Sequence, residues 1–313
     1  MPIKPNTVLA ITGPTASGKT ALSLEIASMI GMPAEIISAD SRQIFRLLDI
    51  GTAKPNAQEL ATIKHHCIDI CDPDETFNAG AFAKKAGEII QELLSKNTLP
   101  IIVGGSGLYV QALCEGFFEM PSEKAESFHK ARKEVQEFHE MHGRDALFEA
   151  LRAVDSQSCE DYPDKNPRRI MRALEFHKAM GLRFSEQKSR MMTYPEFDTC
   201  YVMIEHDREI LYRRINERCD QMWEGTKKEA RSMLEKGISR KAQSLDTVGY
   251  AQAIASIYGE IDEKTAIEKM KQATRNYAKR QITWSKRLEG LHMLKGNIQE
   301  MAMEAITLLN ADP

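Results

Sequence analysis

The stretch ITGPTASGKT, residues 11 to 20, has the residue types and spacing of a phosphate-binding loop. It fits the pattern G-x-x-x-x-G-K-[ST], in which backbone N–H groups and the start of the next helix supply fixed positive dipoles. Gly13 and Gly18 let the backbone pass close to phosphate oxygens. Lys19 adds a full charge, and Thr20 is placed to bind Mg²⁺. The pattern predicts a site for linked phosphates, which could belong to ATP or to another diphosphate.

A second residue that could take part in chemistry is Asp40, which ends the strand-like run AEIISAD. Ligands of parallel sheets bind at the carboxyl ends of the strands, so we expect Asp40 to face the same cleft as Lys19. The carboxylate could hold Mg²⁺, as in an ATPase, or act as a base toward an acceptor. It could also cap a helix that begins at DSRQIF. The residues alone leave these three roles open.

Basic residues gather in two later segments. Residues 165–190 carry eight basic and two acidic residues, a net charge of +6, and Arg168 and Arg172 share one helix face. That face could contact phosphates of a nucleic acid or could simply be solvated. Residues 271–287 have six basic residues and no acid, with Tyr277 and Trp284 between them. Such a pattern suits base stacking, but it also suits a helix that packs its rings inward.

The composition sets the class of protein. The 313 residues are 42% apolar and 28% charged, which predicts a packed globular core, and the net charge of −3 argues against indiscriminate nucleic-acid binding. No run of 18 apolar residues occurs, so we expect no membrane span. The six cysteines form no C-x-x-C pair and no disulfide framework, which favours the reducing cytoplasm. The stretch HHCIDIC, residues 65–71, is expected to be a strand rather than a zinc site.

The elements that position these residues alternate between strand and helix. Strand-like runs are TVLAI, AEIISAD, TLPIIV and YVMIEHD, and helical periodicity follows the first and third of them. We therefore predict an α/β fold, a P-loop-type parallel sheet flanked by helices. Residues 122–198 are helix-rich and read as a helical insertion domain, so that residues 1–121 and 199–313 form the core. The remainder from residue 208 onward is expected to be a helical C-terminal region.

Several longer stretches together resemble one family. They appear in the order GPTASGKTAL, ISADSRQIFR, DIGTAKP, HHCIDICDP, PIIVGGSGLYVQAL, NPRRIMRALE, VGYAQA and YAKRQITW, from about residue 8 to 287. This order is similar to that of bacterial tRNA dimethylallyltransferases, the tRNA isopentenyltransferase or IPP transferase family. The resemblance implies transfer of a five-carbon dimethylallyl group from dimethylallyl diphosphate to N6 of adenosine 37 in the tRNA anticodon loop. The products are i6A and diphosphate, and no ATP is consumed.

The resemblance also assigns residues. Asp40 matches the general base toward the adenine amine, and Thr15 and Arg218 match residues that act on the donor. The donor-binding loop corresponds to Gly13, Pro14, Thr15, Ala16, Ser17, Gly18, Lys19 and Thr20. The residues that match tRNA-contacting positions are Asp40, Ser41, Arg42, Gln43, Ser106, Arg168, Arg169, Ile170, Met171, Arg172, Asp246, Thr247, Val248, Gly249, Tyr250 and Ala251. The resemblance further implies Mg²⁺ bound at Thr20, the tRNA anticodon arm as a partner, a monomeric state and a cytoplasmic location.

Two departures from the family pattern bear on tRNA contacts. Ala251 stands where a basic residue is common, and Ser285-Lys286 stand where an aromatic residue and Arg are usual. Two other classes of protein would share part of the pattern. A small-molecule kinase would explain the loop and Asp40 but not the basic segments, and a nucleotide-gated RNA-binding module would explain the basic segments without catalysis.

Overall fold

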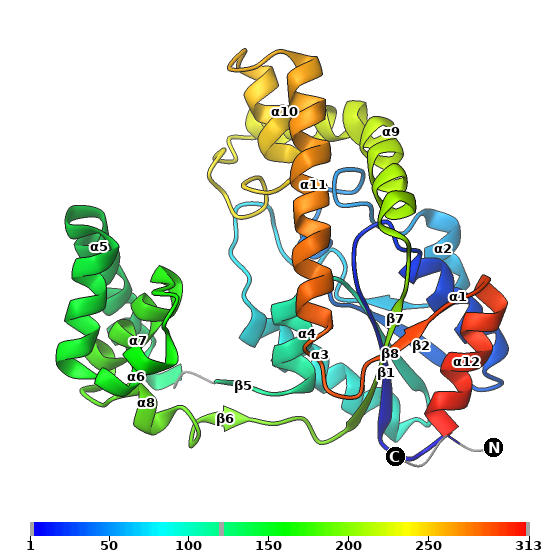
Figure 1. Cartoon of the computed structure of the whole chain (residues 1–313), viewed down its shortest axis with the longest axis horizontal. Helices are drawn as coiled ribbons and strands as arrows, with labels where there is room; N and C mark the ends of the chain where they lie inside the picture. The colour runs from blue at the N-terminus through cyan, green and yellow to red at the C-terminus, as the bar shows by residue number, and fades with distance from the viewer. Residues whose placement is uncertain (1–2, 119–121, 311–313) are drawn as a thin grey trace. The chain divides into compact units, whose positions relative to one another are not determined.

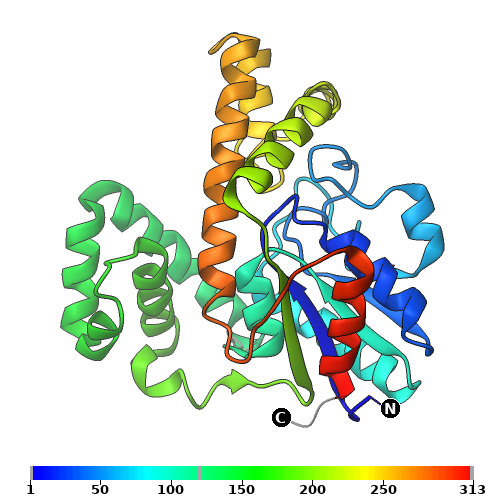
Figure 2. The same cartoon turned by 45° about the vertical axis from the view of Figure 1, so that its right-hand side comes forward.

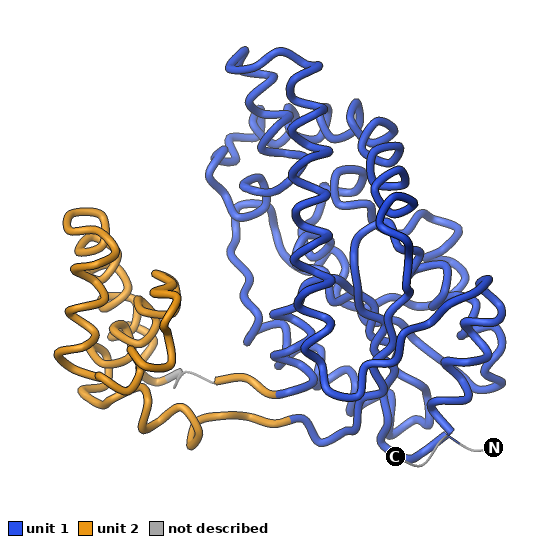
Figure 3. The backbone as a smooth tube through the Cα atoms, in the orientation of Figure 1, with its two compact units in different colours: residues 1–115, 195–313 blue, residues 116–194 orange. Residues whose placement is uncertain are grey.

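The computed structural model describes residues 3–118 and 122–310, which form two compact units (Figure 3). The large unit comprises Met1–Glu115 and Pro195–Pro313, and the small unit comprises Gly116–Tyr194. The small unit starts and ends a few residues before the expected insertion, residues 122–198. It starts earlier because β5 (Phe117–Phe118) pairs antiparallel with β6 (Met192–Thr193), and it ends earlier because the chain from Asp198 onward forms a strand of the large unit's sheet.

The large unit contains a parallel sheet of six strands in the order β3-β2-β4-β1-β7-β8. The strands are β1 (Thr7–Thr12), β2 (Ala34–Ser38), β3 (His65–His66), β4 (Leu99–Val103), β7 (Asp198–Ile204) and β8 (His292–Leu294). Central β1 pairs with β4 on one side and with β7 on the other, and its six residues are all buried. Since the strands are parallel, their carboxyl ends meet at one edge of the sheet.

Helices cover both faces of this sheet (Figures 1 and 2). On one face α1 (Lys19–Met29) packs against α12 (Ile298–Asn310), and on the other α3 (Ala79–Ser95) packs against α4 (Gly107–Cys114). A short helix, α2 (Ala57–Thr62), precedes β3 and begins with a capping box on Asn56. The predicted parallel sheet flanked by helices is confirmed.

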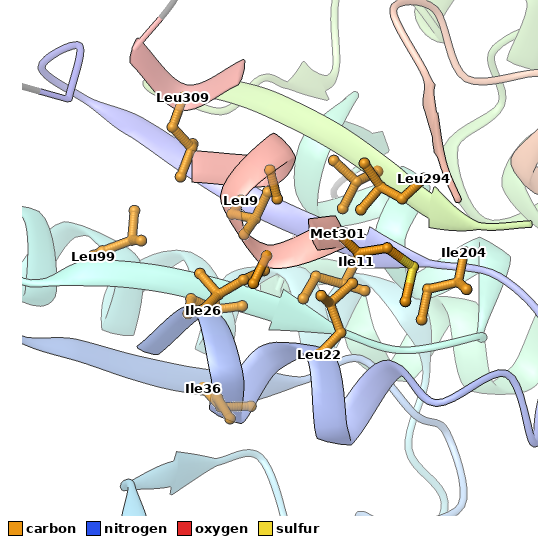
Figure 4. Close-up of a cluster of buried hydrophobic side chains, with 14 residues drawn as sticks. Leu9, Ile11, Leu22, Ile26, Ile36, Leu99, Ile204, Leu294, Met301 and Leu309 are labelled. Atoms are coloured by element: carbon orange, nitrogen blue, oxygen red, sulfur yellow. The ribbon is translucent and has the colours of Figure 1, made fainter. Parts of the chain in front are cut away.

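The core of the large unit lies between β1 and its neighbours on one side and α1 and α12 on the other (Figure 4). Its buried apolar side chains come from five strands and two helices, as their alternation and helical spacing in the sequence require. They are Leu9, Ile11, Leu22, Ile26, Ile36, Leu99, Ile101, Val202, Ile204, Leu294, Met301, Ala302, Ala305 and Leu309. This packing fixes the loop that joins β1 to α1.

Three further helices of the large unit pack on one another beyond the carboxyl edge of the sheet (Figure 1). They are α9 (Arg208–Glu235), which follows β7, α10 (Tyr250–Ile257) and α11 (Glu263–Ser285). The end of α11 returns to the sheet, where the Thr12 hydroxyl donates to the Ser285 hydroxyl at 3.1 Å. The helices thereby stand over the residues that follow β1, β2 and β4.

The small unit is helical around its own core. Its elements are a 3₁₀ turn (Ser122–Lys124), α5 (Ala125–Val154), α6 (Ser156–Asp161), α7 (Pro167–Met180) and α8 (Phe184–Gln187). The core side chains are Phe128, Val135, Leu147, Phe148, Leu151, Cys159, Tyr162, Ile170, Ala173, Leu174, Phe176 and Phe184. Helix α7 begins at the Asn166 cap with Pro167 in its first turn and ends at Gly181, which has φ 70°.

One expectation about the elements is wrong, and one short strand was not expected. Residues 67–71 do not form a strand, because Cys67 and Asp69 adopt positive φ angles of 62° and 55° that break the extended chain after β3. The C-terminal region is helical as predicted, but its three residues His292–Leu294 add β8 to the sheet edge. Three residues are too few for an alternation of apolar and polar side chains to be recognised in the sequence.

Within the described ranges, no helix is both long and apolar enough to cross a bilayer.

Candidate active site

The phosphate-type loop lies between β1 and α1, as the sequence predicts. Gly13 and Gly18 have φ angles of 119° and 95°, which side chains with a Cβ rarely adopt, and Ala16 is left-handed at 62°. The Nζ group of Lys19 lies inside the loop and donates to the carbonyl oxygens of Gly13, at 3.1 Å, and Pro14, at 2.6 Å. The loop thus holds its ammonium group close to its own backbone.

Two side chains from elements distant in the sequence form hydrogen bonds with the backbone of this loop. The Thr15 N–H donates to Oε1 of Gln281 at 2.9 Å, and Nε2 of Gln281 donates to the carbonyl of Gly105 at 2.9 Å. His206, just after β7, donates from Nε2 to the carbonyl of Ser17 at 2.7 Å. The hydroxyl of Ser17 is buried and has no hydrogen-bond partner among the described residues. Ser17 lines neither of the two cavities at this loop, so its hydroxyl lies inside the loop rather than at a ligand-facing surface.

A cavity of about 470 Å³ opens beside the loop in the large unit. Its wall contains the three residues that the sequence assigned to catalysis, Thr15, Asp40 and Arg218. The other lining residues are Ala16, Ser41, Arg42, Gly51, Thr52, Ala53, Ile215, Cys219, Met222, Asp246, Thr247, Val248, Ala251, Gln252, Met270, Thr274, Tyr277, Arg280 and Gln281. Cations and carboxylates share the wall with apolar side chains, so the cavity suits a ligand with both an anionic and an apolar part.

Asp40 stands where this cavity adjoins a smaller one of about 50 Å³, and it lines both. Its Oδ1 accepts the N–H of Arg42 at 2.8 Å, and the chain from residue 41 runs through turns. The helix-cap interpretation of Asp40 is therefore wrong. The hydroxyl of Ser106 accepts the Ser41 N–H at 2.9 Å and lies 3.1 Å from the Ser41 hydroxyl, which fixes the backbone next to the carboxylate.

Charges in the site perturb one another. Burial lowers the pKa of Lys19 to about 8, although the Asp40 carboxylate opposes this shift, and the Arg218 guanidinium adds to it. Burial also lowers the pKa of Arg218, again opposed by Asp40. Burial, with a contribution from Asp40, raises the pKa of Tyr277 to about 12. Because burial disfavours the charged forms of Lys19 and Arg218, an anionic ligand that enters the site would stabilise both cations.

The smaller cavity could hold a hard cation. Thr20 and Asp40 line it together with Lys19, Ser23, Ser38 and Gln43, so that hydroxyl and carboxylate oxygens face one small space. Among the residues described, no three His, Cys, Asp or Glu side chains gather into a metal site. A magnesium ion is compatible with this poor ligand set, because it commonly keeps waters and shares oxygens of a bound phosphate.

In the large unit, some of the residues matched to tRNA contacts line the larger cavity, and others are buried in the fold. Asp246, Thr247, Val248 and Ala251 line the larger cavity, as do Ser41 and Arg42. Gly249 and Tyr250 are buried, and the Tyr250 side chain is fully inaccessible. Gln43 is engaged within the fold, since its Oε1 accepts the Ser38 hydroxyl at 2.9 Å.

The matched segment of the small unit also presents some side chains and buries others. Arg168 and Arg169 are exposed at the start of α7. Ile170 is fully buried in that unit's core, and Met171 is half-buried. Arg172 lies with its guanidinium carbon 5.6 Å from the centre of the Phe118 ring. Arg168 and Arg169 are therefore the members of this segment most open to a ligand.

Comparison with known proteins identifies the family. The model of the family described as IPP transferase matches residues 43–288. The tRNA dimethylallyltransferase of Staphylococcus carnosus is 40% identical over 283 residues, 89% of this chain and 88% of that protein. The chain belongs to the IPP transferase family. The predicted resemblance is confirmed.

Solved structures of IPP transferases share the fold. One is the tRNA delta(2)-isopentenylpyrophosphate transferase of Staphylococcus epidermidis, 37% identical, with a TM-score of 0.69 over 98% of this chain and 99% of that one. Another is a eukaryotic dimethylallyltransferase described as acting on tRNA, 26% identical, with a TM-score of 0.76 over 92% of this chain and 73% of that one.

Some residues of this IPP transferase reach the site without having been singled out from the sequence. Gln281 lies in the stretch YAKRQITW, which was noted for its cations and rings, yet its amide is what fastens the loop. His206 is the second, and its Nε2 lies 3.4 Å from Nη1 of Arg214, which shares a face of α9 with Arg218 as its four-residue spacing predicts. A polar residue on a buried helix face was the available signal for Gln281. No sequence pattern pointed to His206.

Proposed function

We propose that this IPP transferase moves a dimethylallyl group from dimethylallyl diphosphate to N6 of adenosine 37 in the anticodon loop of tRNA, forming i6A and diphosphate. The position of Asp40 between two cavities supports this proposal. Its carboxylate lines both the larger cavity and the small one that contains Lys19 and Thr20. A donor whose diphosphate sits at the loop would present its allylic carbon beside this carboxylate.

The chemistry follows from these groups. The C–O bond to diphosphate breaks, and its electron pair leaves with the diphosphate. Loop N–H groups, Lys19 and Arg218 would stabilise that charge. A C–N bond forms between the allylic carbon and N6, while Asp40 accepts the proton that N6 loses. When bound, Mg²⁺ would supply further positive charge to the leaving group, and Thr20 would hold it.

The acceptor must reach this carboxylate, which requires the adenine to leave its stack. Anticodon loops allow this because their bases are single-stranded. The larger cavity has room and polar groups for a base, and Arg280 and Tyr277 of α11 lie in its wall. We propose that Arg168 and Arg169 of the small unit contact tRNA phosphates.

The experiment is incubation of the protein with dimethylallyl diphosphate, Mg²⁺ and unmodified tRNA, followed by nucleoside mass spectrometry. We expect i6A with wild type and with Asp74→Asn, an exposed acid that serves as the control, and loss of i6A with Asp40→Asn. AMP as a competing acceptor tests whether the tRNA is needed. Turnover of ATP without i6A formation would instead establish the kinase interpretation.

We also propose a monomer that works in the cytoplasm. The six cysteines are free, five of them buried, which suits a reducing compartment. Light scattering during size-exclusion chromatography tests the first statement, and a mass of twice 35.3 kDa would refute it.

A further inference from the structure

One carboxylate outside the cavity joins two of its walls. Glu229, on α9, accepts hydrogen bonds with both oxygens. Its Oε1 accepts the N–H groups of Asp49, at 3.0 Å, and Ile50, at 2.7 Å. Its Oε2 accepts the N–H of Gly51, at 3.0 Å, and the hydroxyl of Tyr250, at 2.6 Å. Three consecutive backbone dipoles and a phenol thus converge on a single side chain.

The partners belong to two separate segments. We call residues 49–53 the 49–53 loop and residues 246–251 the 246–251 turn. The loop supplies Gly51, Thr52 and Ala53 to the cavity, and the turn supplies four of its residues. Glu229 itself is not among the lining residues. It therefore contacts both segments from behind, without reaching a ligand.

The 49–53 loop is closely packed against its neighbours. A Cβ added to Gly51 would overlap the ring of Tyr250, and one added to Gly225 would approach Ile50 Cδ1 at 2.5 Å. The loop therefore lies directly on α9 and on the Tyr250 ring. Tyr250 is fully buried, and burial together with the Glu229 charge raises the pKa of its phenol, so it remains a hydrogen-bond donor.

We infer that Glu229 is a positioning residue that holds the 49–53 loop and the 246–251 turn in register as the two walls that receive the acceptor adenosine. This rests on the proposed function. The donor is served by the phosphate-type loop, Lys19 and Arg218, none of which Glu229 contacts. Loss of Glu229 therefore weakens the binding of tRNA more than it affects donor binding or the chemical step.

The test compares Glu229→Gln, Tyr250→Phe and the control Glu224→Gln, an exposed acid on the same helix. An amide keeps one acceptor oxygen but turns N–H donors toward backbone N–H groups. We expect Glu229→Gln to raise KM for tRNA about tenfold, with kcat and the KM for dimethylallyl diphosphate within about twofold of wild type. Tyr250→Phe, which keeps the three backbone bonds, raises KM for tRNA about threefold. Glu224→Gln changes nothing.

A split between KM and kcat distinguishes positioning from a merely structural role, since partial unfolding would lower the active fraction and leave KM unchanged. An unchanged KM for tRNA in Glu229→Gln, or a fall in kcat alone, overturns the inference. If Glu229→Gln does not fold, as judged by circular dichroism, Tyr250→Phe decides in the same way. Absence of transfer by wild type and by Glu224→Gln would instead count against the proposed function itself.

Discussion

The lowered pKa of Lys19 predicts how donor binding depends on pH. The value of about 8 means that the ammonium group of the free enzyme loses its proton well within a range that can be measured. A bound diphosphate favours the charged form and raises this pKa, so binding takes up a proton whenever Lys19 is neutral beforehand. Donor affinity is therefore constant well below pH 8 and falls as the pH rises through about 8.

The magnitude follows from the titration. At pH 9, one unit above the pKa, about a tenth of the free enzyme carries the charged Lys19, so Kd for dimethylallyl diphosphate should rise about tenfold, a cost of about 1.4 kcal/mol. The donor itself does not titrate there, because the last proton of a phosphate ester leaves near pH ~6. Isothermal titration without tRNA, from pH 7 to pH 9.5 and in buffers of different ionisation enthalpy, measures both Kd and proton uptake.

Neighbouring residues provide the controls. Lys19→Arg should abolish the dependence, because a guanidinium stays charged throughout this range. Asp40→Asn removes the charge that raises the Lys19 pKa, so the midpoint should move to lower pH. Arg218→Gln removes a charge that lowers it, so the midpoint should move to higher pH. A Kd for wild type that stays flat from pH 7 to pH 9.5, or shifts of the same sign in these two variants, would refute the reasoning.

Three more outcomes follow from the structure. Asp40→Asn should reduce the rate constant of the transfer step about 10²–10⁴-fold in a single-turnover assay, with tRNA affinity retained in a filter-binding measurement; full activity would exclude a general base there. Gln281→Leu leaves two backbone groups without their partner, so urea denaturation should show a loss of about 1–3 kcal/mol, whereas the exposed Gln272→Leu should cost little. Phe176→Ala removes a fully buried ring from the small unit and should destabilise that unit by about 3–5 kcal/mol by calorimetry, with donor affinity of the large unit preserved.

Some strands of the sheet can be predicted from the sequence and others cannot, for physical reasons. Strands β1, β2 and β4 are short, largely apolar runs, and such runs report burial directly. Turn-forming residues mark some of their ends, since β1 lies between Asn6 and Gly13 and β4 is followed by Gly104. The run CIDIC at residues 67–71 alternates between apolar and polar side chains, which also predicts a strand, but positive φ angles at Cys67 and Asp69 turn it into a loop. Alternation reports which side chains could be buried, and it does not report the backbone conformation that buries them. Both Cys67 and Cys71 are buried all the same.

The family, the phosphate-type loop and its companion Asp40 can be identified from the sequence, because they depend on local spacing and on the strand that each residue follows. Which distant groups complete the site depends on how the chain packs in three dimensions. Gln281 is 266 residues from Thr15, and Glu229 is about 180 residues from the loop whose N–H groups it accepts. Tyr250 likewise occupies a stretch matched to tRNA contacts, yet its ring is packed on Gly51 and bonded to Glu229. Such pairings arise from how helices α9, α10 and α11 pack over the sheet edge, and no local pattern encodes that packing.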